Sequence, residues 1–328
     1  MYIEKTEQCI QDRSIEHIKI TKLLFIYAKT ASDEGLNISS DTVYGQEKFT
    51  ECVSYYLIID ERKTRKRKRR YSMGKIIAIA NQKGGVGKTT TTINLSACLA
   101  EKGKKVLVVD LDPQGNTTSG LGIDKNSLEK TVYELLRNEC TVEECIIENQ
   151  YENLSVIPAN RNLAGAELEL ITQDNMQFIV KEKLDLIKEQ YDFIVLDCPP
   201  ALGMLTVNSM TAADSVLVPI QCEFYALDGL SQLIYTIDLI RQSLNPQLRI
   251  NGVVFTMYDS RNNLSLQVVE NVKENLNYKI YETLIPRNVR LAEAPSYGMP
   301  INVYSSKSAG AQSYRNLAEE VIENERGN

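Results

Sequence analysis

From Met73 onward, short apolar runs rich in β-branched residues alternate with longer stretches in which apolar residues recur every three or four positions. The short runs predict strands at Lys75–Ala80, Lys105–Asp110, Leu154–Pro158, Phe193–Asp197, Ser215–Pro219, Ile250–Thr256 and Ile280–Ile285. The longer stretches predict helices at Thr89–Lys102, Phe178–Glu189, Leu227–Leu244 and Leu264–Leu276. Because continuously apolar strands are buried on both faces, we expect an α/β fold, a mostly parallel twisted sheet flanked by helices. Ligands in such folds bind at the carboxyl ends of the strands.

Residues 1–72 follow a different pattern. They show no sustained periodicity and end in a basic run, with eight Lys or Arg residues between Arg62 and Arg70. They carry 14 basic and 11 acidic residues, a net charge of +3, whereas residues 73–328 carry 23 basic and 32 acidic residues, a net charge of −9. We expect 1–72 to be a poorly ordered N-terminal extension and 73–328 to be the main domain.

The basic run has two interpretations. Clustered Lys and Arg side chains neutralise phosphates, which favours an arm for nucleic acid or acidic lipid. The same residues would also result if a purine-rich ribosome-binding site were translated in frame ahead of a start codon at Met73. We hypothesise that Met73 is the physiological start. An intact peptide beginning at Met1 in the native cellular protein would exclude this hypothesis.

The composition narrows the possible chemistry. No apolar run reaches the roughly 18–20 uncharged residues of a membrane span, and charges stand where a signal peptide needs its apolar core. The seven cysteines include no CxxC pair, which is typical of reduced cytosolic thiols, and we expect Cys140 and Cys145 on a helical turn and its exit. His17 is the single histidine, so catalytic triads and histidine-ligated metals are excluded for the main domain.

The stretch NQKGGVGKTTTT, at Asn81–Thr92, follows a predicted strand and opens a predicted helix, which is the context of a phosphate-binding P-loop. Its three glycines let backbone N–H groups wrap around phosphates, and the helix N-terminus favours negative charge. We expect Lys88 to reach the β- and γ-phosphates and Thr89 to ligate Mg²⁺. The loop departs from the general pattern G-x-x-x-x-G-K-[ST] at Gln82 and carries a second lysine, Lys83.

Three aspartates follow predicted strands. Asp110 and Asp112 in VLVVDLDPQGN come at one strand end and, as alternate residues, point to the same side. Asp197 in FIVLDCPP ends another strand, where it is positioned to hold a Mg²⁺-bound water before two prolines break the strand. One such aspartate could simply cap a helix. Three of them beside a P-loop indicate a metal and water site.

Four segments, KGGVGKTT, VDLDPQGN, DCPPALG and IPRNVRLAEAPS, together closely resemble the ParA/Soj family, the chromosome- and plasmid-partition ATPases of the deviant Walker A group. The resemblance covers essentially all of 73–328 and begins at MGKIIAIANQKGG, which favours a start at Met73. It does not extend to 1–72, where we see no helix-turn-helix of the kind that longer plasmid partition ATPases carry. The resemblance implies a P-loop NTPase that hydrolyses ATP with Mg²⁺.

The resemblance also implies a role for the second lysine. In this family the residue matching Lys83 reaches across a two-fold interface to the nucleotide of the partner subunit, and Gly84 would lie where the two loops approach. Two facing ATP molecules gather several negative charges, and an ammonium supplied in trans offsets them only when the dimer closes. We therefore expect a homodimer that forms with ATP and separates after hydrolysis.

The remaining site residues are implied in the same way. Asp112 is similar to the residue that orients the attacking water, so the expected catalytic residues are Lys83, Lys88 and Asp112. Asp110 and Asp197 are similar to second-shell or metal-linked carboxylates, so the expected metal site is Thr89, Asp110 and Asp197. Pro286 and Asn288 in IPRNVRL are similar to the adenine-contacting segment. The expected nucleotide-binding residues are Gly84, Gly85, Val86, Gly87, Lys88, Thr89, Thr90, Pro286 and Asn288.

Expected partners follow from the resemblance and the charge. The net charge of 73–328 argues against a wholly basic DNA-binding face, so DNA should meet a local patch. Arg261 and Arg290 match family positions that serve non-specific binding of double-stranded DNA, although both could be ordinary exposed arginines. A ParB-like centromere-binding protein would stimulate hydrolysis, which should otherwise be slow without an arginine finger. We expect a cytoplasmic protein associated with the nucleoid.

Three alternatives differ in testable features. A relative of the membrane-associated positioning ATPase MinD would end in a basic amphipathic helix, whereas this chain ends in the acidic YRNLAEEVIENERGN. An iron–sulfur protein resembling the nitrogenase iron protein would need positioned cysteines, and Cys198 is more simply a small buried residue. A metabolic P-loop ligase or kinase would need an acceptor site, of which the sequence gives no sign.

Overall fold

The computed structural model describes residues 74–170, 175–223 and 226–326, and the predictions made for residues 1–72 lie outside these described residues. The described chain forms an eight-stranded sheet in the order β3-β4-β2-β5-β1-β6-β7-β8. Neighbouring strands run parallel except β3, which is antiparallel to β4. The strands are β1 Lys75–Ile79, β2 Val106–Asp110, β3 Ile147–Tyr151, β4 Leu154–Ile157, β5 Phe193–Asp197, β6 Ser215–Gln221, β7 Arg249–Tyr258 and β8 Ile280–Pro286.

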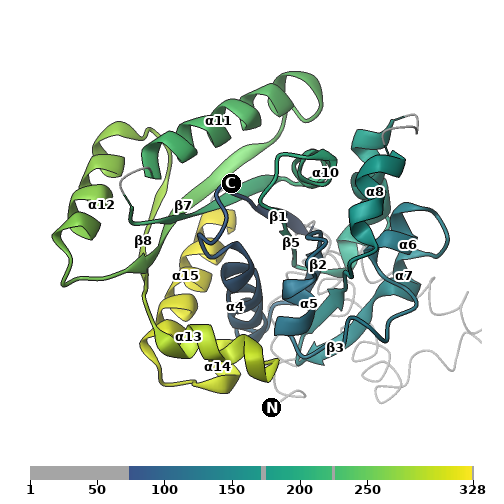
Figure 1. The fold of residues 1–328 in the computed structure, drawn as a ribbon, viewed down its shortest axis with the longest axis horizontal. Helices are drawn as coiled ribbons and strands as arrows, with labels where there is room; N and C mark the ends of the chain where they lie inside the picture. Colours follow the sequence, from purple (N-terminus) through teal and green to yellow (C-terminus); the bar gives the residue numbers. More distant parts are fainter. Residues whose placement is uncertain (1–73, 171–174, 224–225, 327–328) are drawn as a thin grey trace, which may run out of the picture. The chain divides into compact units, whose positions relative to one another are not determined.

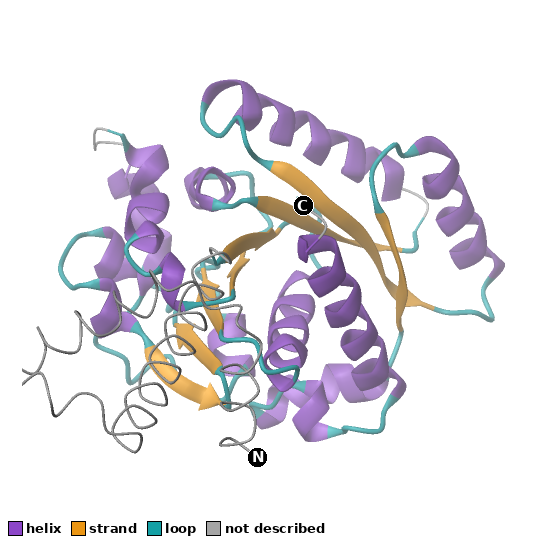
Figure 2. Ribbon diagram, turned by 180° about the vertical axis from the view of Figure 1, so that it is seen from behind, coloured by secondary structure: helices purple, strands orange, loops and turns teal. Residues whose placement is uncertain are grey.

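Helices cover both faces of the sheet, as Figures 1 and 2 show from opposite sides. One layer comprises α4 Lys88–Glu101, α5 Asn116–Gly120, α13 Val289–Glu293, α14 Ile301–Tyr304 and α15 Ala309–Arg326. The other comprises α6 Val132–Leu136, α7 Val142–Cys145, α8 Leu163–Leu170, α9 Ile179–Asp185, α10 Met204–Ala212, α11 Ala226–Ser243 and α12 Asn263–Asn275. Short 3₁₀ turns lie at η2 Met176–Phe178, η3 Lys188–Gln190 and η4 Ala294–Tyr297.

The side chains of β1 show why a continuously apolar strand was predicted to be buried on both faces. Ile77 and Ile79 belong to the core shared with α4 and α15, whereas Ile76 and Ala78 belong to the core shared with α10 and α11. All four are fully buried. The two-residue period of a strand thus divides one apolar run between two cores, and the expected α/β sheet is confirmed.

Most predicted elements are confirmed. Each of the seven predicted strands is present with its ends shifted by at most two residues, and three of the four predicted helices match α4, α11 and α12 within one residue. The prediction of one helix at Phe178–Glu189 was wrong in extent, because α9 ends at Asp185 and a 3₁₀ turn follows. Strand β3 was not predicted, since IENQY is largely polar and lies at the sheet edge.

No helix was predicted for the C-terminal segment, which nevertheless forms α15. Its buried residues recur at helical spacing as Tyr314, Leu317, Ala318, Val321 and Ile322. This stripe packs against α4 and β8. The segment has few large apolar residues, but they are spaced so that they form a continuous stripe facing the core.

The two cysteines predicted on a helical turn and its exit lie close to that turn. Cys145 is the last residue of α7, whereas Cys140 precedes the Thr141 N-cap instead of lying on the helix. Both thiols are free, and their Sγ atoms are 2.9 Å apart.

Candidate nucleotide site

The P-loop joins β1 to α4 at the middle of the sheet. Gly85 and Gly87 adopt left-handed backbone conformations, with φ of 76° and 88°. Residues with a Cβ rarely adopt such angles, so these two glycines are required by the turn itself. Gly87 is the N-cap of α4, and its carbonyl accepts a hydrogen bond from the Thr91 N–H at 2.8 Å. The loop therefore leads directly into a helix N-terminus, as a phosphate site requires.

Polar side chains outside the loop fix its backbone. The Asn81 amide donates to the Pro219 carbonyl at 2.8 Å, and the Asn81 Oδ1 accepts from the Lys83 N–H at 3.0 Å. The buried Thr256 hydroxyl on β7 lies 2.8 Å from the carbonyl of Val86 and 3.1 Å from that of Ile220. These contacts tie the loop to β6 and β7, so its shape is set before any ligand arrives.

The two lysines of the loop have different surroundings. Lys88 is buried, and its Nζ donates to the Lys83 carbonyl at 3.1 Å, so its side chain folds back over the loop. Burial lowers the pKa of Lys88, and the negative charges of Asp197 and Asp112 oppose that shift. Lys83 instead has a side chain that is 40% exposed, and its ammonium pairs with the carboxylate of Glu223. Only Lys88 is thus enclosed with the loop.

Asp197 stands at the end of β5 inside a cage of threonine hydroxyls. Its Oδ2 accepts hydrogen bonds from Thr89 at 2.9 Å and from Thr117 at 2.7 Å, and its Oδ1 accepts from Thr92 at 3.1 Å. Parallel pairing brings this aspartate beside both β1 and β2, because Asp197 is the register partner of Ile79 and of Asp110. The sequence-predicted group of P-loop and strand-end carboxylates is therefore brought together.

Asp110 is fully buried, and both of its carboxylate oxygens have partners. Its Oδ2 accepts from the Thr118 N–H and hydroxyl at 2.8 and 2.7 Å, and its Oδ1 accepts from the Asp112 N–H at 3.2 Å. Asp112 lies beyond the strand end, where its own Oδ1 accepts from the Gln114 N–H at 2.9 Å. Asp110 thus holds α5 and the Asp112 turn in place.

The two buried carboxylates take up protons more readily than ordinary aspartates. Burial, assisted by the charge of Asp197, raises the pKa of Asp110 to about 7. Burial also raises the pKa of Asp197 to about 6, against the opposing hydrogen bonds of Thr117 and Thr89. Burial and the neighbouring negative charge thus both favour the protonated form of Asp110.

The donor atoms of this site fit Mg²⁺. Hydroxyl and carboxylate oxygens are the ligands that Mg²⁺ prefers, and the ion usually completes its shell with phosphate oxygens and waters. Within the described ranges, no three His, Cys, Asp or Glu side chains form a group that could hold a metal ion. The oxygen donors present suit an ion held together with a nucleotide, and the Thr89 hydroxyl, in the first turn of α4, is a candidate ligand.

The other predicted nucleotide-binding residues follow the carboxyl ends of parallel strands. Pro286 ends β8, three strands from β1, and Asn288 caps α13 by accepting from the Arg290 N–H at 2.8 Å. Thr90 lies in the first turn of α4.

The two predicted DNA-binding arginines are both exposed and both paired. Arg261 contacts Asp259 at 2.8 Å, and Arg290 contacts Glu293 at 2.8 Å.

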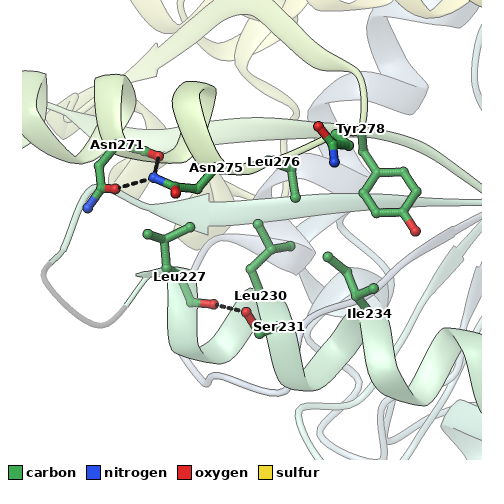
Figure 3. Close-up of a pocket in the computed structure, with 9 residues that line it drawn as sticks. Leu227, Leu230, Ser231, Ile234, Asn271, Asn275, Leu276 and Tyr278 are labelled. Atoms are coloured by element: carbon green, nitrogen blue, oxygen red, sulfur yellow. Dashed lines mark hydrogen bonds between the residues drawn. The ribbon is translucent and has the colours of Figure 1, made fainter.

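A pocket lies away from these residues, between α11 and α12 (Figure 3). Its volume is about 590 Å³, and Leu227, Leu230, Ile234 and Leu276 form much of its wall. Ser231, Asn271, Asn275, Asn277 and Tyr278 complete the lining. Its lining contains no carboxylate or amine, so this pocket lacks the charged side chains that the P-loop site has.

Comparison with known proteins identifies the family. The AAA domain family matches residues 74–250. The sporulation initiation inhibitor protein Soj of Bacillus subtilis (strain 168) is 56% identical over 252 residues, which make up 77% of this chain and 100% of that protein. The chain belongs to the ParA/Soj family of partition ATPases. The chromosome partitioning protein ParA of Myxococcus xanthus (strain DK1622) is 51% identical over 76% of this chain and 89% of that protein.

Solved structures agree with this ParA/Soj fold. Cobyrinic acid a,c-diamide synthase from Mycobacterium smegmatis, with bound ADP and magnesium, has a TM-score of 0.68 at 37% identity, over 76% of this chain and 94% of that one. The cell division ATPase MinD of Pyrococcus furiosus has a TM-score of 0.64 at 29% identity, over 76% and 99%. As a ParA/Soj protein, this chain is a P-loop ATPase that uses ATP and Mg²⁺.

Several residues of this ParA/Soj site were missed at the sequence level. Thr92 and Thr117 belong to the hydroxyl cage around Asp197, and Thr118 binds Asp110. Thr256 and Glu223 support the loop and its exposed lysine. The threonine run TTTT and the pair in NTTSG were visible signals for the cage. Thr256 and Glu223 gave no signal, because each reaches the loop from more than a hundred residues away.

Proposed function

We propose that this partition ATPase is an ATP-dependent dimeric switch. Two subunits close face to face when each holds ATP, and Lys83 of each subunit then offsets phosphate charge in the nucleotide of the other. The closed dimer binds double-stranded DNA without sequence preference. Hydrolysis to ADP and phosphate opens the dimer and releases the DNA.

The observation that carries this proposal concerns Gly84. Its φ lies outside the left-handed region, and a Cβ built on it would meet no atom within 4 Å in the described part of the chain. Gly84 therefore has no conformational or steric need for glycine within the subunit, unlike Gly85 and Gly87. A close approach by a second subunit supplies the missing reason. The outward, exposed position of Lys83 in the same loop supports the same interface.

The proposed chemistry uses the positions described above. Lys88 and the loop N–H groups bind the β- and γ-phosphates, and Thr89 presents its hydroxyl to the ion. A Mg²⁺ ion held there would supply positive charge that offsets the charge of the phosphates. Asp112 orients the attacking water, while Asp110 and Asp197 act from the second shell, because hydrogen-bond donors already contact their oxygens. Pro286 and Asn288 contact the adenine.

The proposed DNA contacts are Arg261 and Arg290. Backbone pairing between β7 and β8 supports their being neighbours, since Tyr258 is the register partner of Pro286. Both arginines are exposed, and ion pairs at the protein surface contribute only about 0–1 kcal/mol, so a DNA phosphate can replace the carboxylate. Closing the dimer doubles the number of arginines offered to one duplex. DNA binding should therefore depend on ATP and weaken steeply with salt.

The proposal extends to the partner and the place of action. A ParB-like centromere-binding protein, acting through a short basic N-terminal segment, would stimulate the slow hydrolysis and free the ATPase from DNA. The protein would work in the cytoplasm on the nucleoid surface. The similarity to Soj of Bacillus subtilis and to the chromosome partitioning protein ParA of Myxococcus xanthus supports a role in partitioning.

The alternative is a membrane-cycling switch resembling MinD. Such proteins need a free amphipathic segment with a basic polar face. Here the apolar stripe of α15 is buried against α4 and β8, and its exposed face carries Glu319 and Glu323. No helix in the described part of the chain is long and apolar enough to cross a membrane. These features favour DNA over lipid as the surface.

The test is sedimentation of the full chain with long duplex DNA of unrelated sequence at low salt, with ATP or with ADP. We expect binding with ATP only, and a loss of at least roughly tenfold in affinity for Arg290→Glu. Arg137→Glu is the matched control, because Arg137 is also a surface arginine paired with acids. Equal binding with ADP, or equal loss in both variants, would refute the proposed site. Dimerisation without DNA binding would point to a membrane or protein surface.

A further inference from the structure

We infer that Glu223 is the resting counter-ion of Lys83, positioning its side chain in the free subunit and releasing it when two nucleotide-bound subunits meet. The inference rests on the proposed trans role of Lys83. It adds a residue on the β6–α11 connection to the dimer switch. Glu223 acts through Lys83, so it is a positioning residue.

The backbones of both partners are fixed. The Glu223 N–H donates to the Gln221 carbonyl at 2.8 Å, and its carbonyl accepts from the Ala226 N–H at 3.0 Å. On the other side, the Lys83 N–H donates to Asn81, and the Lys83 carbonyl accepts from Lys88. The loop can therefore keep its phosphate-binding shape while only the Lys83 side chain moves. This separation lets the free subunit bind ATP with Lys83 still paired.

The pairing also directs Lys83 away from its own nucleotide. The ammonium contacts a carboxylate 140 positions along the chain instead of turning into the loop that Lys88 occupies. A lysine held in this way is available at the surface for a neighbouring subunit. Without Glu223, the Lys83 side chain would sample many rotamers at the surface.

The Lys83–Glu223 ion pair is weak enough to be exchanged when two subunits meet. The two side chains are 40% and 41% exposed, so water screens the attraction and the pair is easily exchanged. Triphosphate oxygens in the partner subunit offer Lys83 more negative charge than one carboxylate does. After exchange, Glu223 regains water at little cost because it is half exposed. Each closing dimer breaks two such pairs, so the factor by which one pair changes the dimerisation constant enters twice.

The first experiment measures the pair directly. The full chain without nucleotide is treated with an acetylating ester, and mass spectrometry follows the labelling rate of Lys83 relative to the exposed Lys307. In Glu223→Gln we expect Lys83 to label about two- to fivefold faster, since the ammonium loses its carboxylate. Asp228→Asn removes an equal charge from the exposed first turn of α11 and should leave the rate unchanged. Equal Lys83 rates in Glu223→Gln and the parent would overturn the inference.

The second experiment measures dimerisation by analytical ultracentrifugation with a non-hydrolysable ATP analogue and Mg²⁺. We expect Glu223→Gln to form dimers at roughly three- to tenfold lower protein concentration than the parent or Asp228→Asn, because two pairs no longer have to break. Nucleotide affinity of the dilute monomer should stay the same. Faster labelling with unchanged dimerisation would also overturn the inference, while leaving the dimer switch intact. No analogue-dependent dimer in the parent would instead refute the switch, and the role of Glu223 with it.

Discussion

The buried aspartates show how much of this site is decided by single side chains. Asp110 and Asp197 are fully buried next to each other, yet within the described residues neither contacts a basic side chain through an ion pair or hydrogen bond. Threonine hydroxyls and backbone N–H groups satisfy them instead. Neutral donors stabilise a carboxylate less than a cation does, so the site stays short of positive charge until Mg²⁺ and Lys88 meet the nucleotide.

This arrangement predicts a pH dependence of stability in EDTA without nucleotide. The unfolded chain ionises Asp110 near its ordinary pKa of 3.8, whereas the folded protein holds the proton up to about pH 7. The folded state thus binds more protons between these values, so the free energy of unfolding falls as the pH rises from about 4 to about 7 and levels off above. Thermal unfolding at half-unit pH steps measures this slope.

Asp110→Asn is the control for that slope. Asparagine does not ionise, so the variant should show a flatter dependence between pH 5 and 7, even if lost hydrogen bonds to Thr118 lower its overall stability. Asp197, whose pKa is also raised, accounts for the slope that remains. The same slope in both proteins would mean that other groups titrate and that Asp110 does not.

At single positions, the sequence allowed the P-loop glycines, Lys88, Thr89 and the three aspartates to be identified, because short local motifs encode them. It did not reveal Thr256 or Glu223, which meet the loop only after β6 and β7 have paired with β1. It also gave too little weight to the threonines around Asp197. A hydroxyl is informative only when the position of its acceptor is known.

Among the elements, α15 illustrates how a polar composition can hide a core helix. Its buried residues pack on α4 and β8, and the Tyr314 hydroxyl lies 3.2 Å from that of Thr91 on α4. Near its end, Glu325 accepts two hydrogen bonds from Arg249 and one from Asn251 on β7. Helix α15 therefore supports the helix that carries the phosphate loop.

We expect Leu317→Ala to lower the free energy of unfolding by about 3 kcal/mol, because Leu317 is fully buried and its truncation leaves a cavity. Urea denaturation of the full chain measures the change. Asn316→Ala, one position earlier on the exposed side, should stay within about 0.5 kcal/mol of the parent. A loss below about 1 kcal/mol for Leu317→Ala would mean that α15 is not part of the core.

The elements found from the sequence were those with strong periodicity. The seven strands were found because a short run of mostly apolar residues is enough to indicate a strand, and α4, α11 and α12 because each has at least 13 residues. Helices α5, α6, α7, α13 and α14 have only four or five residues each. Such short helices are set by capping and by neighbouring packing, as the capping boxes at Thr131 and Thr141 show. Periodicity needs more residues than these helices contain.

For the assembled molecule, the proposed dimer makes a sharp distinction between two glycines. Gly84 and Gly229 both have open space around a built Cβ, and neither has a left-handed φ. We expect Gly84→Ala to weaken ATP-dependent dimerisation at least about tenfold, because the added methyl group would meet the partner loop. Gly229→Ala should leave dimerisation unchanged. Analytical ultracentrifugation with the ATP analogue measures both, and equal dimerisation of the two variants would contradict the proposed interface.

The sheet order has a consequence for how the protein is made. Strand β1 has β5 and β6 as its neighbours, and Lys75 must wait for Phe193, more than a hundred residues later. At translation rates of about 5–20 residues per second, this wait lasts roughly 6–24 s. For that time an apolar strand with two open edges is exposed to wrong pairing. The central place that buries β1 completely in the finished ATPase thus makes it the segment of the nascent chain that most needs a chaperone.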